Sequence, residues 1–138
     1  MRAFPRLIAC AFALVSTGAA CDDGGSGDAA PPSFQELRAE VLTPACVFQT
    51  CHKSGASPAG MLNLEGEDDA VHMRIVDAPA TVAGRVLVVP MDPDASYLFE
   101  KLVSDTPAVG TRMPMTGPLE DDRIEMVRAW IEAGAAND

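Results

Sequence analysis

The sequence predicts a small all-α domain that follows an N-terminal export segment. Apolar residues recur at helical spacing, or follow a helix-start signal, in four segments at 33–43, 68–76, 92–103 and 120–134. One β-branched stretch, 85–89, has no second strand to pair with, so we expect an extended buried segment or a lone short strand there. The chain of 138 residues is long enough for one domain with a modest core.

The first predicted helix has a clear start signal. Residues 33–36 read Ser-Phe-Gln-Glu, the pattern of a capping box in which the serine and the glutamate each satisfy a backbone N–H of the other. Apolar side chains at Phe34, Leu37 and Val41 then share one face of the helix. We expect Pro44 to end this helix, because proline removes a backbone donor and restricts the residue before it.

The last two predicted helices have recognisable ends and inward faces. Asp92 reads as an N-cap with Pro93 in the first helical position. The acidic residues 120–122 suit the positive end of the final helix, and Gly134 is the expected residue just past its C-terminus. The side chains expected to face inward on these helices are Tyr97, Leu98, Phe99, Leu102, Ile124, Val127, Trp130 and Ile131.

The residues before the domain predict export and a lipid anchor. Residues 1–20 have a basic start and an apolar core too short for a permanent membrane span, which is the pattern of a cleaved signal peptide. The segment runs into Ala-Cys and so resembles a bacterial lipoprotein signal, in which Cys21 is lipidated and becomes the new N-terminus. Residues 21–32 predict a flexible tether, and 33–138 the folded domain. The alternative is a plain secretory signal cut at the same point.

The charge balance narrows the class of partner. Lys and Arg number 10 against 20 Asp and Glu, and removing residues 1–20, which hold two arginines and no acid, takes the net charge from −10 to −12. This charge argues against nucleic acid, and a basic patch for anionic lipid headgroups is also missing. We expect either a partner protein with a basic docking surface or acidity that serves solubility alone.

The chemistry of the domain is concentrated in the seven residues Cys46–His52. They read Cys-Val-Phe-Gln-Thr-Cys-His, so that a histidine directly follows the second cysteine. This adjacency indicates covalent haem attachment, in which the two thiols add to porphyrin vinyl groups and the imidazole binds the iron. The usual gap between the cysteines is two residues, and here it is four. Cys10 leaves with the signal and Cys21 takes the lipid, so one pair of thiols remains for a haem or for a disulfide.

Four further motifs follow in order along the chain. They are Gly60–Leu64, Val89–Leu98, Arg112–Pro114 and Trp130–Ala135. Together with the cysteine motif they match, in the same order, Gly-x-Leu-x-Leu, Val-Pro-x-Asp-Pro-x-x-Ser-x-Leu, Arg-Met-Pro and Trp-Ile-x-x-Gly-Ala. This succession resembles the class I c-type cytochromes, and more closely the single-haem modules of exported bacterial lipoproteins with a Cys-x4-Cys-His motif. The resemblance implies a small helical domain around one haem.

The resemblance also implies a role for each of four residues. Cys46 and Cys51 would form the thioethers to one haem c, and His52 would be the proximal iron ligand. Met113 would offer its sulfur as the distal ligand, a pairing with histidine that raises the reduction potential relative to two histidines.

Two other residues compete for the distal position. The long irregular loop 104–118 holds Met115 as well as Met113. His72 is the only other histidine, and we expect it on the surface of a short helix. Zinc is a poorer fit than iron to the cysteine motif, because only three good ligands cluster there.

The expected function is one-electron transfer by a covalently attached haem. The protein would be exported and lipid-anchored to a bacterial membrane, with the domain facing the periplasm or the outside. No cluster of catalytic acid, base or nucleophile stands out, so we expect an electron carrier, or a relay for a redox enzyme, and no substrate turnover. The alternative is a haem-free lipoprotein in which a Cys46–Cys51 disulfide holds a binding or structural module of the envelope.

A Cys21→Ser substitution should release the exported protein from the membrane into the soluble envelope fraction, because losing the lipid removes most of its membrane affinity. Cell fractionation followed by immunoblotting measures this. Cys10→Ser is the matched control, since that cysteine lies within the part of the signal that is removed. Unchanged membrane association of the Cys21→Ser protein would contradict the predicted anchor.

Overall fold

The computed structural model describes residues 30–48, 51–53, 59–82 and 84–138. Its regular elements are α1 (Phe34–Leu37), η1 (Arg38–Cys46), η2 (Ala59–Met61), α2 (Asp68–Ile75), α3 (Tyr97–Val103) and α4 (Asp121–Glu132). The predicted all-α class is therefore confirmed for the described residues. The predicted signal (1–20), Cys21 and most of the tether lie outside them.

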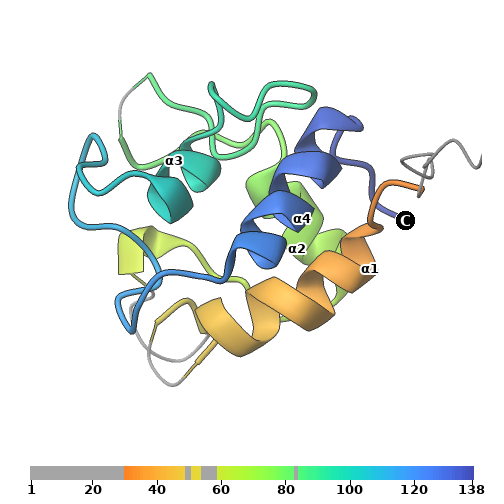
Figure 1. Cartoon of the computed structure of the whole chain (residues 1–138), viewed down its shortest axis with the longest axis horizontal. Coiled ribbons are helices and arrows are strands. Elements are labelled where there is room, and N and C mark those ends of the chain that lie inside the picture. The colour runs from red at the N-terminus through yellow and green to blue at the C-terminus, as the bar shows by residue number, and fades with distance from the viewer. Residues whose placement is uncertain (1–29, 49–50, 54–58, 83) are drawn as a thin grey trace, which may run out of the picture.

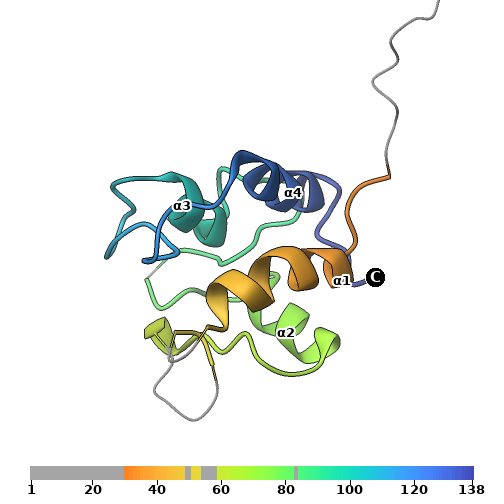
Figure 2. The same cartoon turned by 60° about the horizontal axis from the view of Figure 1, so that its bottom comes forward.

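The first helix lies between two others. α1 packs against both α2 and α4, and α4 also packs against α3. Figure 2 shows α3 and α4 above α1, with α2 beneath it. Figure 1 shows α3 set apart from α1 and α2, among the irregular segments that precede and follow it. One half of the domain is thus built from packed helices, and the other from α3 and long connecting segments.

The helical half is centred on two stacked aromatic rings. Phe34 of α1 and Trp130 of α4 are fully buried, with ring centroids 5.4 Å apart. The ring of His72, on α2, meets Phe34 edge-on at 5.1 Å, and its Nε2 lies 2.7 Å from the Ala135 carbonyl oxygen. His72 lies on a short helix as expected, but it is half-buried rather than on the surface, because its imidazole packs on the aromatic rings while its nitrogen bonds a backbone oxygen.

The start of the first helix agrees with prediction, but its end does not. The capping box at Ser33 and Glu36 is formed with both of its hydrogen bonds, and the predicted apolar face is buried. Pro44 does not end the helix, because η1 continues through it as a wider, π-type helix to Cys46. In this wider winding Val47 N donates to the Leu42 oxygen five residues back, so the missing proline N–H and its bulky ring are tolerated.

The start of α3 also differs from prediction. Asp92 and Pro93 lie in a turn that Asp92 closes by accepting a hydrogen bond from Ala95 N at 2.9 Å. The helix begins only after Ser96, which is fully buried and whose hydroxyl bonds the backbone of residues 89 and 92. An Asp-Pro pair suits a tight turn as well as a helix start, and the buried serine makes the turn the better solution.

The predicted extended segment, 85–89, supports the first turn of α3. It makes isolated bridges rather than a strand, as expected of a segment without a continuous partner. The backbone N–H groups of Tyr97 and Leu98 donate to the oxygens of Val86 and Leu87 at 2.9 and 2.8 Å. The extended segment thereby satisfies N–H groups that every helix leaves unpaired at its start.

The final helix is as predicted. α4 begins at Asp121 and ends at Glu132, and Gly134 follows the C-cap with a φ of +105°, the left-handed conformation that favours glycine. The inward side chains on α3 are buried, and so are Val127, Trp130 and Ile131 on α4. Residues 104–120 between the two helices are irregular, as expected.

Candidate functional site

A large cavity of about 1000 Å³ lies between the end of η1, α3 and the irregular segments that connect the helices. This volume lies at the upper end of the range for small-molecule sites. Most of the side chains around it are apolar, and none of the described residues that line it is Asp or Glu. The residues of the sequence prediction that line the cavity are Cys46, Cys51, His52, Met113 and Met115.

The two cysteines lie on this cavity in different surroundings. Cys46 is the last residue of η1 and packs partly buried against the core, whereas Cys51 is exposed. Both are free thiols in the structure. Burial, and secondarily the neighbouring Cys51, raises the pKa of the Cys46 thiol to about 11. Residues 49–50 of the spacer lie outside the described residues.

Two hydrogen bonds hold His52, one made by its backbone N–H and one made by its ring. Its N–H donates to the Cys46 oxygen at 3.1 Å, which folds the motif back so that its first and last residues meet. The ring Nδ1 lies 3.0 Å from the Leu62 carbonyl oxygen. Because a carbonyl oxygen only accepts, the hydrogen belongs on Nδ1, and Nε2 keeps its lone pair. Metal-binding histidines are commonly oriented by a hydrogen bond of this kind from the ring nitrogen that does not bind the metal.

Arg74 of α2 braces the segment that orients His52. Its guanidinium donates to the backbone oxygens of Asn63 and Glu65 at 3.0 and 2.9 Å, and the arginine lines the cavity. Sequence reasoning missed this residue. Nothing in the local pattern of α2 marks it, because its partners lie about ten residues back in an irregular segment.

The two methionines of the long loop are placed differently. Met113 is half-buried, packs against the core, and donates its N–H to the Lys101 oxygen at 2.6 Å. Met115 is 77% exposed. His72 is not among the residues that line the cavity. The structure therefore brings Met113 to the same cavity as His52 in a more fixed position than Met115, and leaves His72 elsewhere.

Two residues of α3 at the cavity were not predicted as functional. Tyr97 was expected to be core, yet its hydroxyl donates to the Val109 oxygen at 3.1 Å, and Lys101 donates to the same oxygen at 3.0 Å. Partial burial lowers the pKa of the Lys101 ammonium. The spacing of these two residues is a signal that could have been used, since residues four apart share one helix face.

The described residues form a small all-α domain with a large apolar cavity that carries a Cys/Cys/His motif on its wall. Comparisons with protein-family models, with curated proteins and with solved structures gave no match. In the part of the chain that the structure describes, no helix is long and apolar enough to cross a membrane. Nor do the described residues include a group of three or more His, Cys, Asp or Glu side chains able to hold a metal ion by themselves.

The two thiols should differ in reactivity when the protein is prepared reduced and without haem. At pH 8 we expect iodoacetamide to modify Cys51 at least about tenfold faster than Cys46, because the thiolate is the nucleophile and burial keeps Cys46 protonated. Peptide mass mapping measures both rates. In urea the difference should disappear, which is the control. Equal rates in the folded protein would contradict the described burial of Cys46.

Proposed function

We propose that the domain is a one-electron carrier with a single haem c attached through Cys46 and Cys51. The observation that carries this proposal is the convergence of both cysteines, His52 and Met113 on one apolar cavity. The same residues are those to which the resemblance to class I c-type cytochromes assigns the haem. A cytochrome c-like arrangement of the helices is part of the proposal.

The residues around the cavity fit this cofactor in size and in donor chemistry. The volume of about 1000 Å³ and the apolar lining suit a large flat ligand that is itself mostly apolar. A porphyrin supplies four nitrogen ligands, so the protein needs to add only one or two. This need is consistent with a cavity whose candidate ligands are one histidine and the nearby methionines.

Covalent attachment would use the two thiols without any added oxidant. Each S–H adds across a vinyl double bond, so that one carbon–sulfur bond and one carbon–hydrogen bond form and no atom leaves. Cys46 would present its thiol from the end of a helix, and Cys51 from an exposed position next to His52. The thioethers would then fix the cofactor close to the imidazole.

The iron ligands would be His52 and Met113. The bond from His52 Nδ1 to the Leu62 oxygen leaves Nε2 available and fixes the orientation of the ring. Met113 is the better of the two methionine candidates, because it is half-buried on the cavity wall whereas Met115 is exposed. The haem supplies the redox chemistry, and the protein supplies ligands and a pocket that excludes water.

A redox partner would dock at the mouth of the cavity. Four large apolar side chains that line it are exposed, namely Phe48, Met61, Val109 and Met115. The mouth is therefore apolar. A partner protein with a basic docking surface, and a lipid at Cys21 that keeps the domain near a membrane, complete the proposal. The domain would serve as a carrier, or as a relay for a redox enzyme.

The decisive test is whether the exported protein carries haem. Made together with working cytochrome-maturation machinery, it should be red and keep its haem through denaturing electrophoresis, because the thioethers survive unfolding. A variant with both Cys46→Ser and Cys51→Ser should lose that retention. A colourless wild-type protein whose mass fits only a disulfide would favour the haem-free envelope module instead.

The distal ligand can be tested by paired substitutions. Iron bonded to a thioether gives the oxidised protein a weak charge-transfer absorption band in the red, which Met113→Ala should abolish and Met115→Ala should leave in place. The Met113→Ala variant should also have a lower reduction potential, because the thioether favours reduced iron. Loss of the band only in Met115→Ala would assign the ligand to the second methionine.

A further inference from the structure

We infer that Lys101 is a positioning residue that holds the methionine loop against α3 and so keeps the Met113 sulfur at the cavity. This inference rests on the proposed function in so far as Met113 is an iron ligand. The contacts that support it are between α3 and the loop and do not involve the haem.

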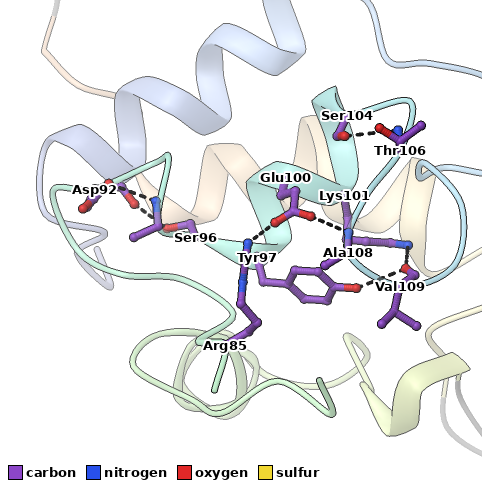
Figure 3. Close-up of polar contacts among 11 residues, drawn as sticks. Arg85, Asp92, Ser96, Tyr97, Glu100, Lys101, Ser104, Thr106, Ala108 and Val109 are labelled. Carbon is purple, nitrogen blue, oxygen red and sulfur yellow. Dashed lines mark hydrogen bonds and ion pairs between the residues drawn. The ribbon is translucent and has the colours of Figure 1, made fainter. Parts of the chain in front are cut away.

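Three side chains from one face of α3 bind the loop. Tyr97, Glu100 and Lys101 stand at positions i, i+3 and i+4 of the helix. Figure 3 shows the Tyr97 hydroxyl and the Lys101 ammonium directed at the Val109 carbonyl oxygen, and the Glu100 carboxylate directed at the Ala108 N–H. These bonds fasten the loop just before the segment that carries Met113.

Lys101 contacts the loop next to Met113 with both its side chain and its backbone. Its ammonium donates to the oxygens of Val109 and Thr111, while its own carbonyl oxygen accepts from Met113 N at 2.6 Å. Gly110 lies between the two bonded carbonyls with a φ of +75°, a left-handed turn that glycine makes without strain. The loop is thus folded around one ammonium group.

The charge of Lys101 has no carboxylate within ion-pair distance among the described residues, unlike Arg85 and Arg112, which pair with Glu100 and Asp105. Its ammonium is directed instead at two neutral backbone oxygens. Hydrogen bonds from a charged donor are stronger than those between neutral groups. A lysine without an acidic partner at this point is therefore best explained by its role in holding the loop.

Other contacts fix the platform on which Lys101 acts. Figure 3 shows the ion pair between the Arg85 guanidinium and Glu100. The guanidinium carbon of Arg85 also lies 5.3 Å from the centre of the Tyr97 ring. Arg112 Nε donates to the Leu102 oxygen at 2.7 Å. These contacts hold the helix and the loop at Arg112, so replacing Lys101 alone should loosen the loop at residues 109–111 without unfolding α3.

The test uses the haem-loaded ferric protein and imidazole as the probe. Imidazole can bind the iron only when Met113 leaves it, so its apparent affinity reports how readily the loop opens. Lys101→Met should raise that affinity about tenfold, the factor expected from losing a charged hydrogen-bond donor. Lys101→Arg, which restores the charge and the donors, should return it to within about threefold of the wild type.

Two further variants keep the result interpretable. Tyr97→Phe removes only the hydroxyl bond to the Val109 oxygen and should shift the imidazole affinity in the same direction by a smaller factor. Arg123→Met is the matched control, because this cation lies on α4 and does not line the cavity. Unchanged imidazole affinity in haem-loaded Lys101→Met would overturn the inference.

A second measurement separates this inference from the proposed function. Hydrogen exchange of the Ala108 and Met113 amides should be about tenfold faster in Lys101→Met, with or without haem, because both amides are protected by bonds to α3. Unchanged exchange would overturn the role of Lys101. A wild-type protein that carries no haem would overturn the electron-transfer proposal, and the amide exchange would still decide whether Lys101 holds the loop.

Discussion

The stack of Phe34 on Trp130 is the contact on which the rest of the domain depends. It joins the first helix to the last, and the edge of His72 brings α2 to the same point. The C-terminal residues after α4 are bound to the same two aromatic residues. Trp130 Nε1 donates to the Ala136 oxygen, and the Asp138 carboxylate accepts from Phe34 N. These contacts pack α1, α2 and α4 together at one end of the domain. The end of η1, α3 and the connecting segments surround the cavity at the other end.

The walls of that cavity are held by backbone carbonyls gathered around single cations. Arg74 collects the oxygens of Asn63 and Glu65 on the side of His52, and Lys101 collects those of Val109 and Thr111 on the side of Met113. Irregular segments leave some of their carbonyls without the regular backbone partners that helices and sheets provide. A charged side chain from a neighbouring helix satisfies several at once and fixes the path of the chain.

The parts of the fold that depend on residues close together in the sequence could be predicted from it. The capping box at 33–36 and the glycine after α4 are local signals, and both are formed. The predictions made from Pro44 and Asp92 were wrong because each residue suits two local structures. Pro44 can end a helix or lie within a wider one, Asp92 can begin a helix or close a turn, and tertiary packing selects between them. His72 was misplaced because only the folded chain brings α1 and α4 to its ring. Of the candidate site, the sequence singled out Cys46, Cys51, His52 and Met113, and the structure places all four on one cavity. The sequence did not point to Arg74 and Lys101, because they bind segments whose positions only the folded chain defines.

The large cavity has a consequence for the amount of folded protein in the cell. Protein interiors are normally packed without large voids, so a domain of this size with a hollow of about 1000 Å³ gives up contacts that would otherwise stabilise it. Under the proposed function the haem would stay on the unfolded chain through its thioethers, but it would fill the hollow and make those contacts only in the folded chain, and so increase the folded share. Proteases degrade the unfolded share, so the steady-state abundance of the protein would follow the supply of its ligand.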